Sequence, residues 1–444
     1  QGRGSDAPRA GETQQDRGLI RPASATHGDP AMLDLQPATG RRRASHGRFG
    51  LALAGGGPLG AFYEVGCLHA IEEAFDGFQL TELEMYVGVS SGAMIAAGLA
   101  NGFDTADMGL VFIHNASNEM KFSPALFLMP AFREYARRIA GAPGMLAGIA
   151  REYLRDPGKD WAEIIDPLGR LLPTGICDNR PLERVMARLF AADGRTNDFR
   201  KLAPKLYIVA TELNTGHSVR FGEPGFDHIP ISRAIQASTA LPGLYPPVAI
   251  DGRVYADGAL LRTMNASILL DAGTDLIICV NPLVAFDASS APRPPHGFPP
   301  DEHDLTHGGL PTVLSQTFRS LIQSRMQAGF KSYKQRYPHA DVLLFEPDHG
   351  DGELFFQNMF RYADRRRLAE HSYQRTRYDL LQQADGLKPL LQRHGITLRL
   401  DVLEDRRRTF LRAVQERKRR QLPVTGALHR TLDRLEHAVA SRPD

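Results

Sequence analysis

Short apolar runs alternate with helix-periodic segments along the middle of this 444-residue chain. Each run has the length of one buried strand, and the segments between the runs carry apolar residues at helical spacing. This alternation is typical of an α/β fold, in which helices sandwich a mostly parallel sheet and ligands bind at the carboxyl ends of the strands. The predicted strands lie at residues 49–54, 85–87, 205–210, 275–280 and 342–345.

A serine between two glycines follows the second of these strands. Residues 88–92 read G-V-S-S-G, and an apolar helical segment begins directly after them. In a turn between a strand and a helix, small neighbours such as Gly88 and Gly92 permit the strained backbone that exposes a serine hydroxyl. Ser90 is therefore a candidate nucleophile for acyl transfer, although small residues also gather in ordinary turns.

A glycine-rich turn follows the first strand. Residues 55–60 read G-G-G-P-L-G and lead into a helix predicted over 61–75. The glycines let a ligand approach the backbone, and the start of the helix offers free N–H groups to an anion, so the turn is a candidate oxyanion hole. The same letters satisfy the dinucleotide pattern G-x-G-x-x-G. That fold needs an acidic residue at the end of its second strand, where this chain has the Ser90 turn.

An aspartate followed by glycine ends a third β-type run. Asp257 and Gly258 alone would be explained by a turn. With the glycine turn and the serine turn in this chain order, D-G-A at 257–259 resembles the patatin-like phospholipase family, whose marks are G-G-G-x-x-G, G-x-S-x-G and D-G-[GA]. Residues 210–216 and 234–247 are also similar to segments of that family. The resemblance covers about 49–282 and continues more loosely to about 380.

The resemblance implies a role for each motif. Ser90 would be the nucleophile, Asp257 its general base, and the backbone N–H groups of Gly56 and Gly57 the oxyanion donors. An acyl-enzyme on Ser90 would be hydrolysed by water that Asp257 activates, with no histidine, metal or cofactor. The remaining motif glycines are Gly55, Gly60, Gly88, Gly92 and Gly258.

The expected function is hydrolysis of lipid carboxylic esters. Leu59 stands where the family usually has a basic residue before the last glycine of its loop, so neutral acylglycerols and lysophospholipids remain candidates beside phospholipids. An acyltransferase would use the same acyl-enzyme, and the sequence hardly separates it from a hydrolase. A non-catalytic lipid-binding or scaffold protein with this fold is an alternative from another class, and the presence of all three motifs argues against it.

A Ser-Asp-His triad esterase is the nearest mechanistic alternative. Several histidines follow Asp257 in the chain order that such a triad requires, although none lies in a recognisable motif. They are His296, His303, His307, His339, His349 and His371.

Composition divides the chain into a catalytic middle and two different ends. Residues 1–47 are rich in Gly, Pro, Ser, Gln and Arg without apolar periodicity, which predicts a disordered segment without a secretory signal. A patatin-like catalytic domain is predicted over 48–290, a proline-rich linker over 291–310, and a peripheral part of the catalytic domain over 311–380. Cys67, Cys177 and Cys279 lack C-x-x-C spacing, which favours reduced, mostly buried thiols in a cytoplasmic protein.

A long insertion at 104–199 separates the Ser90 helix from the next predicted strand. Its apolar runs are shorter than a membrane span requires, so a helical cap is expected. The cap could also be a lid that exposes apolar side chains to lipid, with arginines near the head groups. The side chains expected to face lipid are Phe122, Phe127, Met129 and Phe132.

The chain ends in a basic helical tail, predicted over 381–444. From residue 351 onward there are twenty Lys and Arg against thirteen Asp and Glu, a net charge of +7 where the whole chain has +2. Arginine clusters at 365–367, 406–408 and 417–420 are explained either by a solvated helical face or by a peripheral anchor for an anionic membrane. No nucleic-acid motif accompanies the charge, and the oligomeric state cannot be predicted.

Overall fold

The computed structural model describes residues 33–40, 47–116, 123, 125–155, 172–261, 264–285, 309–349 and 364–421. Within them a nine-stranded sheet runs in the order β1-β10-β9-β2-β4-β5-β8-β7, and β6 pairs with β5. The five central strands from β10 to β5 are parallel, as expected for strands that are continuous apolar runs buried on both faces. The mostly parallel α/β sheet predicted from the sequence is confirmed.

The strands carry the predicted segments with small shifts at their ends. Strand β4, for example, continues two residues beyond the predicted run and stops directly before Ser90. A separate two-stranded sheet joins β3 (Phe75–Asp76) to β11 (Thr397–Leu398). The strands of the main sheet are β1 (Leu33–Gln36), β2 (Phe49–Leu53), β4 (Met85–Val89), β5 (Lys205–Glu212), β6 (His217–Phe221), β7 (Val248–Ile250), β8 (Arg253–Asp257), β9 (Leu276–Val280) and β10 (Asp341–Phe345).

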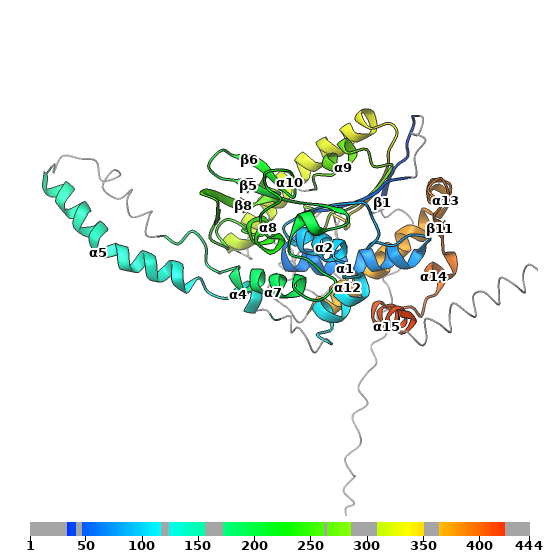
Figure 1. Cartoon of the computed structure of the whole chain (residues 1–444), viewed down its shortest axis with the longest axis horizontal. Helices are drawn as coiled ribbons and strands as arrows, with labels where there is room; N and C mark the ends of the chain where they lie inside the picture. The colour runs from blue at the N-terminus through cyan, green and yellow to red at the C-terminus, as the bar shows by residue number, and fades with distance from the viewer. Residues whose placement is uncertain are drawn as a thin grey trace, which may run out of the picture. The chain divides into compact units, whose positions relative to one another are not determined.

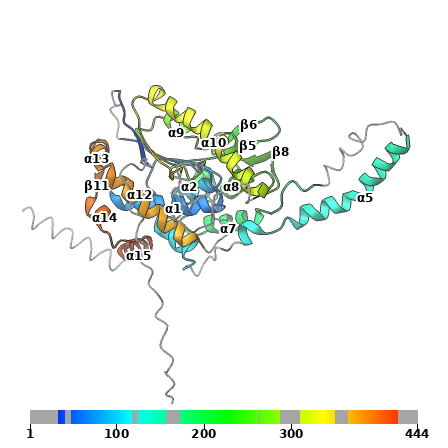
Figure 2. The same ribbon diagram turned by 180° about the vertical axis from the view of Figure 1, so that it is seen from behind.

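Helices cover both faces of the sheet (Figure 1). One buried cluster joins the sheet to α1 (Gly57–Ala74), α2 (Ser91–Ala100), α8 (Ile231–Ser238) and α12 (Arg365–Gln382). A second cluster on the other face joins it to α9 (Ser267–Asp271) and α10 (Gly309–Arg336). From behind, α12 is seen to lie alongside α1 (Figure 2). This layering leaves the carboxyl ends of the parallel strands free to carry functional turns.

The described residues of the insertion at 104–199 are largely helical, as a cap would be. They form α3 (Thr105–Met108), the π-helix η1 (Gly109–Ile113), α4 (Ala125–Leu128), α5 (Phe132–Arg155), α7 (Arg180–Phe190) and the 3₁₀ turn η3 (Phe199–Lys201). Another 3₁₀ turn, η4 (Gly258–Leu260), follows β8. No helix in the described ranges is long and apolar enough to cross a membrane.

The N-terminal segment predicted to be disordered over 1–47 contains a strand, so that prediction is wrong for part of it. Strand β1 pairs antiparallel with β10, which places Leu33 opposite Phe345. The side chain of Leu33 is buried, and Gln383 donates a hydrogen bond to its carbonyl oxygen. Four residues among prolines and glycines have too short a pattern to predict a strand, because their hydrogen-bonding partner lies about three hundred residues away.

The described part of the basic tail packs on α1, α3 and α12. It forms α13 (Ala384–Gln392), α14 (Leu400–Glu404) and α15 (Phe410–Gln421), and Leu391, Phe410 and Val414 are buried in the same core cluster as α1. The tail therefore contributes core residues as well as charge, up to its last described residue, Gln421.

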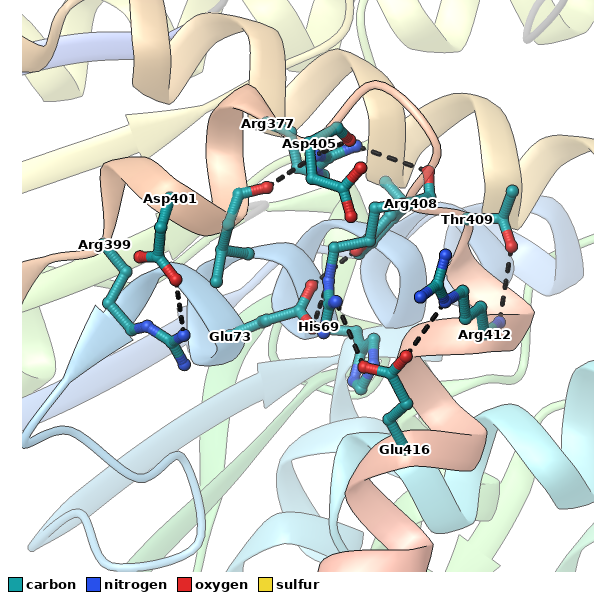
Figure 3. A network of polar contacts seen from close by, with 12 residues as sticks. His69, Glu73, Arg377, Arg399, Asp401, Asp405, Arg408, Thr409, Arg412 and Glu416 are labelled. Atoms are coloured by element: carbon teal, nitrogen blue, oxygen red, sulfur yellow. Dashed lines mark hydrogen bonds and ion pairs between the residues drawn. The ribbon is translucent and has the colours of Figure 1, made fainter. Parts of the chain in front are cut away.

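Ion pairs hold α15 against the acidic side of α1 and α3. The Arg417 guanidinium lies 2.9 Å from the buried Glu72 carboxylate, and Lys418 Nζ lies 2.7 Å from Asp107 Oδ1. Figure 3 shows Arg408 between Glu73 of α1 and Glu416 of α15. Arg408, Arg417 and Lys418 of the tail are thus paired with carboxylates of this chain.

Candidate active site

Ser90 lies at a sharp turn between β4 and α2. Its φ of 53° and ψ of −120° place it in the left-handed half of conformational space, which a non-glycine residue adopts only when its surroundings enforce it. A Cβ on Gly92 would lie 2.5 Å from the carbonyl oxygen of Ala54, so only glycine fits there. The serine side chain therefore stands at the amino end of α2, as the sequence predicts for a nucleophile.

The sheet register brings Asp257 level with Ser90. Val89 pairs with Val209, the residue after Val209 pairs with Asp257, and β5 lies between the two site strands. The two side chains meet above β5, where Ser90 Oγ donates a 2.6 Å hydrogen bond to Asp257 Oδ2. The backbone N–H of Ala259 donates to the other carboxylate oxygen at 2.8 Å. The carboxylate is thus held with one oxygen on the serine hydroxyl.

Burial sets the basicity of this carboxylate. The side chain of Asp257 is almost fully enclosed, and the loss of hydration disfavours its charged form. This desolvation raises the pKa of Asp257 to about 6, although the hydrogen bonds from Ser90 and Ala259 act in the opposite direction. A carboxylate with this pKa is a better proton acceptor than an exposed aspartate and is still ionised at neutral pH.

The glycine turn after β2 lies directly beside the serine. A Cβ on Gly55 would come within 2.9 Å of Ser90 Cβ, so the turn can approach the nucleophile only without a side chain there. Helix α1 begins at Gly57, which has a φ of 62°. Among the described residues, no acceptor is found for the N–H groups of Gly56 and Gly57, as expected at the open amino end of a helix. These donors are available to an anion bound at the start of α1.

A family profile matches the part of the chain that holds this site. The profile is that of the patatin-like phospholipases, and it covers residues 51–270. The chain contains a patatin-like phospholipase domain. Ser90, Asp257 and all of the glycine turn lie inside the matched region.

The patatin-like domain also has relatives of known sequence. An uncharacterized NTE family protein of Mycobacterium tuberculosis is 38% identical over 73 residues, which are 16% of this chain and 19% of the relative. Another uncharacterized NTE family protein of that species is 24% identical over 358 residues, which are 79% of this chain and 50% of the relative. The chain thus spans half or less of the length of these two relatives.

Solved structures with a partial likeness include two bacterial proteins. VipD from Legionella pneumophila is 19% identical and matches 60% of this chain and 56% of its own, with a TM-score of 0.31. Full-length ExoU in complex with SpcU, from the type III secretion system of Pseudomonas aeruginosa, is 15% identical. It matches 88% of this chain and 77% of its own, with a TM-score of 0.25.

Two hydroxyl residues that the sequence analysis did not single out hold the patatin-like site in place. Ser238 Oγ accepts a 2.8 Å hydrogen bond from the backbone N–H of Ser90 and donates one of 2.6 Å to the carbonyl of Val209. Thr211 Oγ1 donates to the carbonyl of Asp257 at 3.0 Å. Ser238 lies in the segment 234–247 that resembles the family, but no local pattern distinguishes a supporting hydroxyl from an ordinary helical serine.

Adjacent backbone segments join the helical insertion to the strands that carry the candidate site. Segment 175–178 exchanges hydrogen bonds with 129–131 on one side and with 243–245 on the other. The last of these segments follows Ala240, whose carbonyl accepts a 2.9 Å hydrogen bond from the N–H of Asp257. The base of the insertion is therefore connected to the candidate general base by backbone hydrogen bonds and the short chain segment 240–243.

The side chains expected to face lipid differ in their exposure. Phe127 is buried, whereas Met129 is 43% and Phe132 is 68% exposed. Phe122 lies outside the described residues. Leu59, which replaces the usual basic residue, is buried in α1.

No described histidine is hydrogen-bonded to Ser90 or Asp257. Within the described chain, His349 contacts Gln323 and the carbonyl of Ala285 instead. His296, His303 and His307 lie outside the described residues, so their part of the triad alternative is untested. The three cysteines are free and buried. The described ranges contain no group of three or more His, Cys, Asp or Glu residues that could hold a metal ion.

Proposed function

We propose that this protein is a serine acyl hydrolase that cleaves lipid carboxylic esters with a Ser90–Asp257 dyad. The observation that carries the proposal is the 2.6 Å hydrogen bond from Ser90 Oγ to Asp257 Oδ2 beside the open N–H groups of Gly56 and Gly57. A nucleophile, a base and oxyanion donors are the groups that acyl transfer requires. The patatin-like domain supports a lipid ester as the substrate class.

In the first half-reaction, Ser90 Oγ attacks the ester carbonyl carbon while its proton moves to Asp257 Oδ2. The carbonyl oxygen becomes an oxyanion and accepts hydrogen bonds from the N–H groups of Gly56 and Gly57. The tetrahedral intermediate then collapses and breaks the bond to the alcohol oxygen. That oxygen takes the proton from Asp257 and leaves, so an acyl group remains on Ser90 and Asp257 is again ionised.

In the second half-reaction, Asp257 accepts a proton from water as the water oxygen attacks the acyl carbon. The same backbone donors stabilise the second oxyanion. Collapse releases a carboxylic acid, and Ser90 Oγ regains its proton from Asp257. A buried carboxylate with a pKa of about 6 suits this cycle, because it must both accept and return a proton near neutral pH.

Leu59 favours substrates that need no cation on the glycine turn. Its buried apolar side chain supplies no charge for an anionic head group at this position. Neutral acylglycerols and lysophospholipids therefore remain in the proposed substrate class beside phospholipids. A panel of these lipids with identification of the released fatty acid would rank them.

Variants of Ser90, Asp257 and Ser91 test the dyad. Ser90→Ala and Asp257→Asn should each abolish hydrolysis of a soluble p-nitrophenyl ester and of lipid, and a fluorophosphonate should label Ser90 alone in peptide maps. Ser91→Ala is the matched control, because the hydroxyl of Ser91 is buried without a hydrogen-bond partner among the described residues. That variant should keep its activity.

The dyad is wrong if Asp257→Asn retains near wild-type turnover. Loss of activity in a histidine variant instead, with Asp257→Asn active, would establish a histidine-based triad. Absence of a fluorophosphonate adduct on Ser90 in folded, active protein would remove the nucleophile assignment.

A further inference from the structure

Helix α5 carries an exposed apolar stripe. At about 100° per residue, Phe132, Ile139, Leu146 and Leu154 fall within one sector of about 80° around the helix axis. Their side chains are 68%, 72%, 51% and 79% exposed, respectively. Four large exposed apolar side chains along one face of one helix make that face apolar, and exposed apolar surfaces mark contacts with a partner or a membrane.

Arginines follow the same helix on one flank of the stripe. Arg133 and Arg151 are eighteen residues apart, which is five helical turns, so they point in one direction. Arg155 falls about 40° from them, and all three side chains are exposed. Arg137 and Arg138 are both paired with the carboxylate of Glu134. Cations beside an apolar face are the pattern of a helix that lies in the interface of an anionic bilayer.

The middle of α5 is open on its other face as well. A Cβ placed on Gly141, Gly144 or Gly148 would meet no atom within 4 Å. Gly141 and Gly148 lie about opposite the apolar stripe and Gly144 lies on the flank that carries the arginines, so neither face of this part of the helix is covered.

The amino end of α5, in contrast, is fixed near the candidate active site. The N–H of Ala131 and the hydroxyl of Tyr135 both donate to the carbonyl of Ile176 at 3.0 Å. Ile176 in turn donates to the carbonyl of Gly243 at 3.2 Å, in the segment that leads to Asp257. Met129 and Ile176 are exposed apolar residues at this end of the stripe. The apolar surface therefore begins at the backbone segments next to the catalytic turn.

We propose that the apolar stripe of α5 inserts into the surface of an anionic lipid bilayer and places the site against its substrate. The inference rests on the proposed function for its biological purpose, but the binding itself does not require catalysis. The stripe would enter the acyl region while Arg133, Arg151 and Arg155 bind lipid phosphates beside it. With five arginines along its length, α5 lies along the surface instead of crossing it.

Helix α5 is better suited to bind a lipid surface than the basic tail is. Arg408, Arg417 and Lys418 of the tail are paired with carboxylates of this chain. Arg133, Arg151 and Arg155 have no ion pair within the described residues. In the tail up to Gln421 the arginines also lack a comparable apolar stripe, since the apolar side chains Phe410 and Val414 of α15 are buried in the core. Free cations beside exposed apolar side chains are found together on α5.

The contact is tested directly with a polarity-sensitive dye. Ile139→Cys and Gly148→Cys are nine residues apart, so their side chains point in opposite directions on α5. The natural cysteines are buried, so a labelled variant carries its dye at the new position. We expect vesicles of phosphatidylcholine mixed with phosphatidylglycerol to shift the emission of the dye at 139 to the blue and to leave the dye at 148 nearly unchanged. Equal responses at both positions, or none at 139, would overturn the proposal.

Matched substitutions test how much the apolar stripe and its arginines contribute to vesicle binding. In a Ser90→Ala background, which prevents turnover, Leu146→Asp should weaken vesicle flotation by about tenfold or more. Leu321→Asp on α10 is the control, because Leu321 is 54% exposed and Leu146 is 51% exposed. Arg133→Gln and Arg151→Gln should each lower affinity about fivefold on anionic vesicles and leave binding to pure phosphatidylcholine unchanged. Equal losses in Leu146→Asp and Leu321→Asp would contradict a specific face.

Activity separates this inference from the proposed function. With Ser90 present, Leu146→Asp should retain hydrolysis of the soluble ester and lose hydrolysis of vesicle lipid. If the wild type binds vesicles through α5 but hydrolyses no ester, the proposed function fails and the membrane contact stands. If the wild type does not bind anionic vesicles, or if Leu146→Asp only converts a dimer to a monomer in light scattering, the stripe is a protein interface and the inference fails.

Discussion

Ser238 Oγ lies 2.8 Å from the backbone nitrogen of Ser90 and accepts its hydrogen. The same hydroxyl donates to the carbonyl of Val209 on β5, so one side chain ties the strained serine turn to the strand that separates it from Asp257. Positive φ at Ser90 is a strained conformation, and a strained residue persists only where its surroundings hold it. Ser238 is thus a positioning residue for the proposed nucleophile.

Ser238→Ala should lower both stability and catalysis. The substitution leaves the N–H of Ser90 and the carbonyl of Val209 buried without this partner, which costs about 1–3 kcal/mol of unfolding free energy. Because the nucleophile is less well placed, kcat for the soluble ester should fall about tenfold to hundredfold with little change in KM. Ser218→Ala, at an exposed position on β6, is the control and should change neither value. Unchanged kcat in Ser238→Ala would contradict the positioning role.

Activity should depend on the ionisation of Asp257. Its carboxylate must be charged to accept the proton of Ser90, and burial raises the pKa of Asp257 to about 6. We therefore expect kcat/KM for a neutral soluble ester to rise about tenfold per pH unit below about pH 6 and to level off above it. A plateau that already begins near pH 4 would contradict the raised pKa.

The stability of Asp257→Asn relative to wild type should also change with pH. The pKa of Asp257 is about 6 in the folded protein and near 3.8 when exposed, so the folded state binds the proton more tightly. The wild type therefore loses up to about 3 kcal/mol of stability as the pH rises from below 4 to above 6, whereas the asparagine variant has no such charge to bury. Urea unfolding of both proteins at about pH 4 and pH 8 measures this difference. The prediction is wrong if the unfolding free energy of Asp257→Asn does not increase relative to that of the wild type as the pH rises.

Gly55→Ala should inactivate the protein without unfolding it. The added methyl group would lie 2.9 Å from Ser90 Cβ, so the glycine turn or the serine must move. Misplacing an oxyanion donor lowers kcat by about 10²–10³-fold. Gly148→Ala adds the same methyl group into open space on α5 and should leave hydrolysis of the soluble ester unchanged. Circular dichroism would verify that both variants are folded.

Arg417→Met should destabilise the fold much more than Arg412→Met in the same helix. Arg417 pairs with Glu72, whose side chain is fully buried, so its loss leaves a buried carboxyl without its cation and costs about 3 kcal/mol or more. Arg412 pairs with Glu416 at the surface, where an ion pair contributes about 1 kcal/mol or less. Thermal unfolding measures both. Equal changes in Tm would show that α15 does not depend on its contact with α1.

The predictable part of this structure is the part with local signals. β2 and β4 are continuous apolar runs that end at glycine or small residues, so their positions follow from the pattern. The motifs place Ser90 and Asp257 in one site through their resemblance to a family, and the structure brings the two side chains within hydrogen-bond distance, although β8, which ends at Asp257, runs antiparallel to β5.

Other features depend on partners far along the chain. Arg417 lies in a run of four cations that reads as a solvated face, and only the tertiary fold sets it against the buried Glu72. Ser238 is an ordinary helical serine until Ser90 lies above it. Within the α5 stripe the sequence analysis predicts exposure only for Phe132, because an amphipathic pattern indicates an apolar face without indicating whether another element covers it.

Strand β1 also affects how readily the protein aggregates through the edge of its sheet. It occupies the outer side of β10, whose residues from Asp341 to Phe345 are buried and mostly apolar. Without β1, the N–H and carbonyl groups on that side of β10 would be open to pair with another chain, and an apolar edge of this kind promotes aggregation. The four residues from Leu33 to Gln36 therefore act as a guard strand that blocks edge-to-edge association of the sheet.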